Sequence, residues 1–398
     1  MRSKQAFYLG ILALCCIFLS AGNGFFQAAE ADELTVGYAV SLTGRFGMEG
    51  KETGRGYNLW REQTNKGGGL LVGDKRYMIK FVTYDDESNP SVNTKMYEKL
   101  ITRDKVDLIL SPWGSGINFA ASAVADKYHY PIVMSSASAT KIWERGFKYI
   151  FETTQLSPTM MEPWKSFFKA YKDQIKTVAI LYENFLFTLA LRESLVKDLK
   201  EAGVELVLDE KYPLGGKDFT GLLLKVKGVN PDALMVLNIM PASVYATRQA
   251  HEVGLQPKMI AVNIGPMFEE EFIGGLGDLS EKVYESGFWH PKLPYSGAEQ
   301  FAKDFEAAYN KKPSTDAAYA YISTQILSQA IKQAGTIDRE EVNKTLHSGK
   351  FETILGPYEY DEWGVNKSQR GFLCQVQNKE RVIVWPKDLA NAQPQFLR

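Results

Sequence analysis

Apolar and polar positions follow two recurring patterns along most of this 398-residue chain. Short apolar runs bounded by turn residues predict strands, and apolar positions spaced by three or four residues predict helices. The predicted strands are residues 34–40, 75–84, 106–110, 131–134, 177–182, 205–212, 233–237 and 259–262, and the helices between them are 54–65, 90–102, 117–128, 189–202, 219–226 and 243–253. Strands that alternate with helices this regularly indicate parallel β-α-β units.

The alternation occurs twice with a similar plan. In each copy an aspartate introduces a buried strand, Asp107 in the first and Asp232 in the second. This weak duplication predicts two α/β halves. The alternative, one large doubly wound sheet, is less favoured because sheets of more than about ten strands are uncommon. Towards the end of the chain, helices are predicted at 299–310, 316–334 and 339–346, and short strands at 372–376 and 382–385.

The N-terminal segment has the three-part pattern of a secretory signal peptide. Basic residues precede the apolar run 6–19, and the small-residue stretch 28–31 (Ala-Ala-Glu-Ala) follows it. The apolar run is shorter than the roughly 20 residues that a membrane-spanning helix needs. We therefore predict a signal peptide over residues 1–31 and an exported mature chain that begins near Asp32. A retained N-terminal anchor is the alternative.

Composition narrows the class of protein further. Lys and Arg number 46 against 47 for Asp and Glu, so no bulk charge attracts nucleic acid or anionic lipid. Cys15 and Cys16 leave with the predicted signal peptide, which leaves Cys374 as the only thiol, and we interpret it as a core residue. A large exported protein without disulfides favours the bacterial periplasm.

Two loops rich in small hydroxyl residues follow predicted strands. Residues 111–116 (SPWGSG) follow strand 106–110, and residues 135–140 (SSASAT) follow strand 131–134. Ligands of open parallel sheets bind beyond the carboxyl ends of strands, where helix N-termini offer free N–H groups. Either loop alone would usually be only a helix cap. Because both follow adjacent strands, they predict a shared clamp for a carboxylate or amide.

Signatures of catalysis and metal binding are missing from the sequence. It contains no G-x-S-x-G, P-loop or H-E-x-x-H motif, and its four histidines are scattered without ligand spacing. The acidic run 85–87 is interpreted as a solvated turn, because neighbouring side chains on a strand end point to opposite sides. We therefore predict no catalytic residue, no metal site and no cofactor.

Several segments carry a resemblance to a known family. They are LTVGYAVSLTGRFG (34–47), GRGYNLW (54–60), VTYDDESNP (82–90), SPWGSGINFAASAVADKYHYPIVMSSASA (111–139), TVAILYEN (177–184) and GPYEYDEWG (356–364). Through these segments and their order, the whole mature chain resembles the periplasmic substrate-binding proteins of branched-chain-amino-acid-type ABC importers, the group of the leucine–isoleucine–valine-binding protein.

The resemblance implies a type I periplasmic binding fold. In that α/β fold, two Rossmann-like lobes are joined by a three-strand hinge and close on a ligand. The implied N-terminal lobe is residues 32–152 plus 289–356, and the implied C-terminal lobe is 153–288 plus 357–398. The crossovers are expected near 151–154, 287–290 and 355–358.

The resemblance also assigns the ligand site residue by residue. The two hydroxyl-rich loops are implied to grip a carboxylate, and aromatic side chains are implied to form the lid and walls. The assigned residues are Trp113, Gly114 and Ser115, then Ala137, Ser138 and Ala139, with Phe46 and Tyr321 from the first lobe and Phe187, Asn238 and Asn263 from the second.

Asn263 departs from the family pattern in a way that bears on the ligand. Amino-acid binders often place a carboxylate near this position to hold the α-ammonium, and a neutral amide cannot neutralise that charge. With Trp113 and several phenylalanines nearby, we infer an aromatic or apolar ligand whose polar end is a carboxylate or amide. Glu183 or Glu269 is the alternative source of the missing charge.

The function implied is that of an exported receptor. It would capture a small amino-acid-like, aromatic or amide ligand in the periplasm and deliver it to an ABC permease in the inner membrane, acting as a monomer without nucleic acid. A periplasmic sensor that signals to a regulator is the second possibility. An exported hydrolase is the third, and it is disfavoured because no Ser-His-Asp or metal signature is present.

Overall fold

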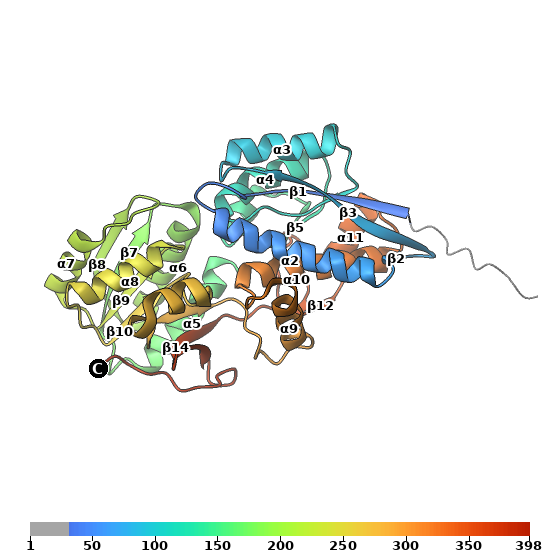
Figure 1. Ribbon diagram of the computed structural model, residues 1–398. Coiled ribbons are helices and arrows are strands. Elements are labelled where there is room, and N and C mark those ends of the chain that lie inside the picture. Colours follow the sequence, from blue (N-terminus) through green and yellow to red (C-terminus); the bar gives the residue numbers. More distant parts are fainter. Residues whose placement is uncertain (1–31) are drawn as a thin grey trace, which may run out of the picture.

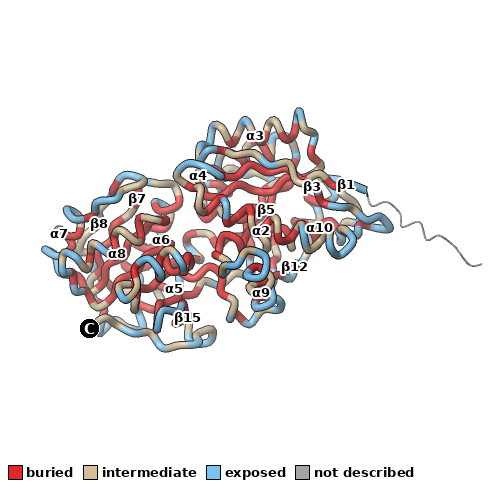
Figure 2. The backbone as a smooth tube through the Cα atoms, in the orientation of Figure 1, coloured by how far each residue is buried: buried red, intermediate tan, exposed pale blue. Residues whose placement is uncertain are grey.

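The computed structural model describes residues 32–398, which form two α/β lobes side by side (Figure 1). The predicted signal peptide, its retained-anchor alternative and both N-terminal cysteines lie outside the described residues. Within those residues, no helix has the length and apolar character needed to cross a membrane. The buried residues lie along the strands of both lobes and on the helix faces that cover them (Figure 2).

The N-terminal lobe is built on a four-stranded sheet of order β2-β3-β1-β4 and a short pair, β5 and β6. Strand β1 is parallel to β3 and β4, while β2 forms an antiparallel hairpin with β3. The strands are β1 (Asp32–Val40), β2 (Leu70–Val72), β3 (Lys75–Asp85), β4 (Leu108–Ile109), β5 (Ile132–Met134) and β6 (Ile150–Glu152), and the helical segments are α2 (Gly47–Lys66), α3 (Pro90–Thr102), α4 (Ser115–Lys127) and η1 (Thr140–Arg145).

The C-terminal lobe is built on a seven-stranded sheet of order β15-β14-β11-β10-β9-β7-β8. Its first five strands along the chain are parallel, and β14 and β15 join antiparallel. The strands are β7 (Thr177–Glu183), β8 (Glu205–Tyr212), β9 (Ala233–Leu237), β10 (Met259–Val262), β11 (Tyr284–Gly287), β14 (Phe372–Gln377) and β15 (Glu380–Trp385), and the helical segments are α5 (Ser157–Ala170), α6 (Leu186–Ala202), α7 (Thr220–Val229), α8 (Ala242–Glu252), η2 (Glu270–Gly274) and η3 (Gly277–Ser280).

The chain returns to the N-terminal lobe after β11. Helices α9 (Ala298–Tyr309), α10 (Thr315–Ala334) and α11 (Arg339–Ser348) precede the hairpin of β12 (Phe351–Thr353) and β13 (Gly356–Tyr358). Helix α10 packs along α2, where Trp60 Nε1 donates a hydrogen bond of 2.9 Å to Ser328 Oγ. A Cβ on Gly56 would lie 2.2 Å from the Ala317 carbonyl oxygen, so only glycine allows the two helices to come this close.

These observations confirm parallel β-α-β units and a two-lobed α/β fold. The alternative of one continuous sheet is wrong, because the strands of the two lobes belong to separate sheets. The residue bounds predicted for each lobe stay a prediction. The core thiol is confirmed: Cys374 on β14 is fully buried, and burial raises its pKa to about 12.

Three crossovers between the lobes are tied to one another by hydrogen bonds. Tyr358 in the third crossover donates from its hydroxyl to the Thr153 carbonyl in the first, at 2.8 Å. Trp289 in the second donates from Nε1 to the Ile354 carbonyl in the third, at 3.2 Å. These bonds join the segments predicted as crossovers to one another, so the segments form one connected cluster between the lobes.

Candidate functional site

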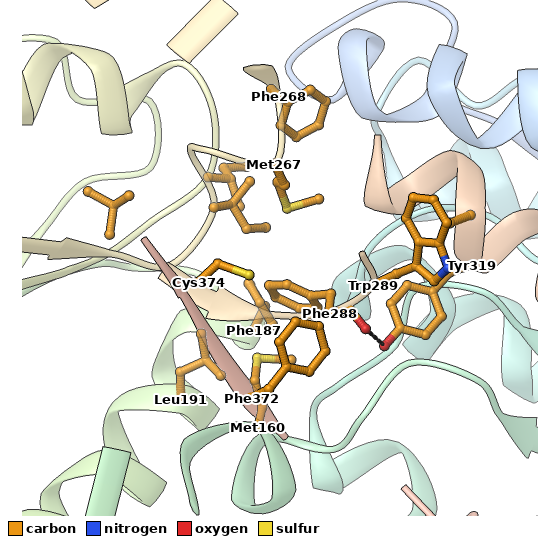
Figure 3. Close-up of a cluster of buried hydrophobic side chains, with 14 of the residues drawn as sticks. Met160, Phe187, Leu191, Met267, Phe268, Phe288, Trp289, Tyr319, Phe372 and Cys374 are labelled. Carbon is orange, nitrogen blue, oxygen red and sulfur yellow. Dashed lines mark hydrogen bonds between the residues drawn. The ribbon is translucent and has the colours of Figure 1, made fainter. Parts of the chain in front are cut away.

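A cavity lies between the two lobes, next to the hinge. Figure 3 shows Phe187, Met267, Phe288 and Tyr319 gathered there, with the Tyr319 hydroxyl bonded to the Phe288 carbonyl at 3.0 Å. The lining is Trp113, Gly114, Ser115, Ser136 and Ser138 from the N-terminal lobe, Phe185, Phe187, Ile264 and Met267 from the C-terminal lobe, Thr154 and Phe288 from the crossovers, and Thr315, Asp316 and Tyr319 from the start of α10.

The two hydroxyl-rich loops meet on the N-terminal side of the cavity. Ser115 opens α4, and its Oγ accepts hydrogen bonds from the backbone N–H of Ser138 (3.1 Å) and of Ala139 (3.3 Å). Because both bonds use the oxygen as acceptor, the Ser115 O–H remains free to donate to a ligand oxygen. Gly114 just before it has a φ of 85°, which a residue with a side chain adopts only under strain.

A buried hydroxyl network holds the two loops in place from behind. Tyr57 on α2 donates to the Ser111 carbonyl at 2.9 Å, and its hydroxyl lies 3.0 Å from Ser135 Oγ. Ser111 Oγ and Ser135 Oγ are 2.9 Å apart. Burial raises the pKa of Tyr57 to about 12, so the phenol stays neutral and keeps its proton for this network. The network therefore ties both loops to α2 and to each other.

Aromatic rings bridge the cleft above the cavity. The Phe46 ring from the N-terminal lobe lies 5.2 Å from that of Trp113 and 5.4 Å from that of Phe185 on the opposite lobe. Phe46 is almost fully buried, and rings from both lobes contact it. These rings form a lid that separates the cavity from solvent in the closed arrangement.

An ion pair also joins the lobes across the cleft. Arg45 of the N-terminal lobe donates from Nη2 to Glu183 Oε1 at 3.0 Å and from Nη1 to the Met240 carbonyl at 2.9 Å, both in the C-terminal lobe. Glu183 is fully buried, and its Oε1 also accepts from Gly215 N at 2.7 Å. A buried carboxylate needs such partners, so closure of the cleft supplies Glu183 with its cation.

This pairing bears on the two alternative sources of charge for a ligand. Glu183 is bound to Arg45, and Glu269 forms a salt bridge of 2.7 Å with Lys312 at the surface. Glu269 does not line the cavity. Both carboxylates therefore already have a cationic partner, although Glu183 Oε2 accepts no hydrogen bond. The alternative that one of them supplies the missing charge stays a prediction.

Two buried carboxyls had not been predicted, one at the cavity and one away from its lining. Asp316 lines the cavity in the first turn of α10, and burial raises its pKa to about 7, with Trp113 opposing and Glu52 reinforcing the shift. Glu49 in the first turn of α2 has a pKa raised to about 8, mainly by burial. The only local signal for either was an acidic residue near a helix start, which is common at N-termini.

The predicted site residues divide into those at the cavity and those behind or away from it. Trp113, Gly114, Ser115, Ser138 and Phe187 line the cavity, and Phe46 contacts the lining through its ring. Ala137 and Ala139 are buried within the clamp loop, Asn238 is hydrogen-bonded to Ser243 Oγ at 2.8 Å, and Asn263 is buried one residue before Ile264 of the lining.

The prediction that Tyr321 forms a wall of the ligand site is wrong. The Tyr321 hydroxyl donates to Gln63 Oε1 at 2.7 Å and its ring lies 4.8 Å from that of Phe301, so it contacts α2 and α9 and not the cavity. Tyr319, two positions earlier on α10, lines the cavity instead. Two residues of helix correspond to a rotation of about 200°, which places the two tyrosines on opposite faces.

Within residues 32–398, no three side chains among His, Cys, Asp and Glu come together in a way that could hold a metal ion. The cavity is instead lined mostly by aromatic and aliphatic groups with a few hydroxyls and one carboxyl. The free volume of the cavity is only about 20 Å³ in this arrangement, so a small organic solute can place its apolar part on the rings and its polar ends on the hydroxyls and the carboxyl only when the lobes are further apart.

Two α/β lobes that enclose such a cavity beside a connected hinge define a solute-binding protein of the two-lobed class. The family described as periplasmic binding protein matches residues 33–381, and the chain belongs to this family. Relatives named for branched-chain amino acids resemble the chain over most of its length.

Curated relatives cover most of the chain. The leucine-, isoleucine-, valine-, threonine- and alanine-binding protein of Pseudomonas aeruginosa is 27% identical over 342 residues, which are 84% of this chain and 87% of the relative. A Leu/Ile/Val-binding protein homologue of Brucella suis is 26% identical over 350 residues, with 87% and 91% covered. Both are similar to this chain over nearly their full length.

Solved structures share the fold. A leucine-binding protein of Thermotoga maritima superposes with a TM-score of 0.78 at 21% identity and covers 89% of this chain and 100% of its own. An ABC-transporter solute-binding protein of R. palustris, in complex with benzoate, superposes with a TM-score of 0.78 at 20% identity and covers 91% and 97%. At this identity the likeness supports the type I periplasmic binding fold.

Proposed function

We propose that this protein is an exported receptor of an ABC importer. It captures a small amino-acid-like, aromatic or amide solute between its lobes in the periplasm and delivers it to a permease in the inner membrane. It acts as a monomer, catalyses no reaction and uses no cofactor. Export by residues 1–31 and lobes of residues 32–152 plus 289–356 and 153–288 plus 357–398 belong to this proposal.

One observation carries the proposal most strongly. The cavity is lined from both lobes, with Trp113, Ser115 and Ser138 on one side and Phe187 on the other. A solute held there contacts both lobes only when they are closed, so it stabilises the closed form over the open form. Relatives named for leucine, isoleucine and valine, and a structural neighbour holding benzoate, support solutes of this size.

The loops and rings have distinct tasks in this account. The Ser115 hydroxyl, with the clamp loop at Ser138 behind it, receives a carboxylate or amide oxygen of the solute. Trp113, Phe46 and Phe187 cover its apolar part. Ala137 and Ala139 shape the clamp loop, while Asn238 and Asn263 support the second lobe from behind the lining.

A thermal-shift screen tests the proposal. Leucine, phenylalanine, benzoate and small aliphatic amides are added to the mature protein, and at least one class should raise its melting temperature, because a ligand that binds only the folded state stabilises it. For the best ligand, Trp113→Ala is expected to raise Kd by at least about 30-fold, the effect of a central aromatic contact of about 2 kcal/mol.

Trp143→Ala is the matched control. Trp143 is also a buried tryptophan of the N-terminal lobe, but it does not line the cavity. Trp143→Ala should lower the free energy of unfolding about as much as Trp113→Ala does. It should leave the ligand Kd within about twofold of the unsubstituted protein, since stability changes outside the site need not alter affinity. Equal affinities of the two variants would show that Trp113 does not contact the ligand. Turnover of any of these compounds by the purified protein would contradict the binding role.

A further inference from the structure

A basic pair in the N-terminal lobe faces an acidic run in the C-terminal lobe. Lys311 and Lys312 lie in the turn between α9 and α10, and residues 269–271 (Glu-Glu-Glu) follow β10. Both segments line a groove of about 310 Å³, and Met267 lines this groove as well as the cavity. Because the lysines and the glutamates belong to different lobes, contact between them depends on how far the lobes are closed.

Two ion pairs join these segments across the groove. Lys312 Nζ lies 2.7 Å from Glu269 Oε2, and Lys311 Nζ lies 3.8 Å from Glu271 Oε1. Glu270, between the two paired glutamates, also lines the groove but forms no ion pair with any of residues 32–398. The acidic run therefore contains two carboxylates that contact the other lobe and one that does not.

Lys311 is also connected to the helix that lines the cavity. Its Nζ donates to Glu52 Oε1 at 3.1 Å, and Glu52 is 1% exposed on α2. Glu52 Oε2 accepts from Ser314 Oγ at 3.1 Å, and the same Oγ caps α10 by accepting from Ala317 N at 3.3 Å. The first two turns of α10 line the cavity. One lysine thus contacts the opposite lobe and, through Glu52, the capped start of α10.

We propose that Lys311 and Lys312 latch the closed lobes by pairing with Glu271 and Glu269. Lys311 also couples this latch to the cavity-lining start of α10 through Glu52 and Ser314. The inference rests on the proposed function and adds positioning residues to it. Neither lysine lines the cavity, so the latch acts on closure and not by contact with the solute.

The exposure of the two pairs sets the size of the effect. The side chains of Lys311 and Glu271 are 17% and 32% exposed, and those of Lys312 and Glu269 are 61% and 29% exposed. Ion pairs that are partly open to solvent stabilise modestly and are screened by salt. Because these pairs join the two lobes, their free energy favours the closed form over the open form. The latch should therefore slow opening and solute release.

Three neighbouring substitutions test the latch. The probe is whichever of leucine, phenylalanine, benzoate and the aliphatic amides binds most tightly in the thermal-shift screen. Glu269→Gln and Glu271→Gln should each raise its Kd about threefold, and about tenfold together. Stopped-flow measurements should show this change mainly as faster dissociation.

Glu270→Gln is the matched control. It removes the same charge from the same acidic run and breaks no ion pair, so Kd and the dissociation rate should stay within about 1.5-fold of the unsubstituted protein. Melting temperatures without added probe report folding separately. A purely structural role of the two paired glutamates would lower these temperatures and leave the dissociation rate unchanged.

Salt gives a second readout of the latch. Raising NaCl from about 0.1 M to about 1 M shortens the screening length from about 10 Å to about 3 Å. This change should speed dissociation from the unsubstituted protein and from Glu270→Gln. The double variant Glu269→Gln with Glu271→Gln should respond much less, because its interlobe pairs are already lost.

Double-mutant cycles with Ser314→Ala test the connection to α10. Ser314→Ala removes the hydroxyl that joins Glu52 to the start of the helix. Lys311 contacts Glu52 and Lys312 does not. The effect of Ser314→Ala on Kd should therefore be non-additive with Glu271→Gln, by at least about threefold, and additive with Glu269→Gln.

The outcomes distinguish this inference from the proposed function. If Glu269→Gln and Glu271→Gln release the probe at the rate of Glu270→Gln, the receptor role stands and the latch is overturned. Additive effects in both cycles would overturn the coupling through Lys311. If no compound of the screen binds, the proposed function fails and the latch fails with it.

Discussion

Replacing Arg381 with methionine is expected to lower the free energy of unfolding by about 3–5 kcal/mol, the cost of leaving a buried charge without its partner. Arg381 on β15 is 7% exposed and Glu285 on β11 is fully buried. The Arg381 Nε bonds Glu285, and its Nη1 donates to the Trp289 carbonyl at 2.9 Å. The substitution would leave Glu285 without a cation in the core of the C-terminal lobe, with the Met267 N–H as its remaining hydrogen-bond donor at 3.0 Å.

Urea unfolding of the ligand-free protein measures this effect. Arg370→Met is the matched control, because Arg370 pairs with Asp388 at the surface, where both side chains are more than half exposed, and an exposed pair contributes at most about 1 kcal/mol. The double variant Arg381→Met with Glu285→Gln should recover part of the loss. A cost below about 1 kcal/mol for Arg381→Met would show that the buried pair is not needed.

Replacing Arg45 with methionine is expected to raise the ligand Kd by at least about 30-fold, equivalent to about 2 kcal/mol for one lost partner of a buried pair. Closure buries Glu183 in contact with Arg45, as the two bonds from Arg45 to the C-terminal lobe show. In the variant, closing the lobes would bury the Glu183 carboxylate without a cation. The open form is then favoured, and the ligand must overcome that difference.

Affinity for the best ligand of the thermal-shift screen measures this effect, with Arg192→Met as the control. Arg192 also forms an ion pair, but its partner Asp209 lies in the same lobe. Loss of this pair should therefore affect the open and closed forms equally. We expect Kd of the control to change by less than about threefold, within the contribution of a partly exposed pair. Equal effects of the two variants would show that Arg45 does not act through closure.

Local signals explain why much of the fold could be predicted. Helix α3 occupies the predicted residues 90–102, because Asn89 caps its first turn through hydrogen bonds to Ser91 N and Val92 N and Pro90 begins it. Strand β8 likewise occupies the predicted residues 205–212. Such caps and alternating patterns lie within a few residues of the element that they define, so they are readable without knowledge of the tertiary structure.

The elements that were missed depend on distant contacts or carry misleading local signals. Helix α5 has proline in its first turn and again at Pro163, which resembles a break in a helix. Strands β6 and β11 are short, and β11 is completed by its antiparallel pairing with β14, where Gly287 lies opposite Phe372. A pairing between residues so far apart leaves no local pattern.

The site shows the same division. The clamp loops could be predicted because ligands of α/β sheets bind beyond the carboxyl ends of the strands, and both loops follow such ends, although β4 and β5 belong to separate sheets. Asp316 could not, because its place at the cavity depends on how α10 packs along α2, which is distant in sequence. The sequence also did not show which side of α10 faces the cavity. Residues 315–320 are all buried, so no exposed polar face at the start of the helix distinguishes Tyr319 from Tyr321.

Small-angle scattering tests most directly whether the two lobes close around a solute. The mature protein is measured alone and with a saturating amount of the tightest ligand from the screen. We expect a smaller radius of gyration with ligand and a curve that fits the closed arrangement, in which Arg45 contacts Glu183. Identical curves with and without a ligand that raises the melting temperature would contradict closure as the mechanism of capture.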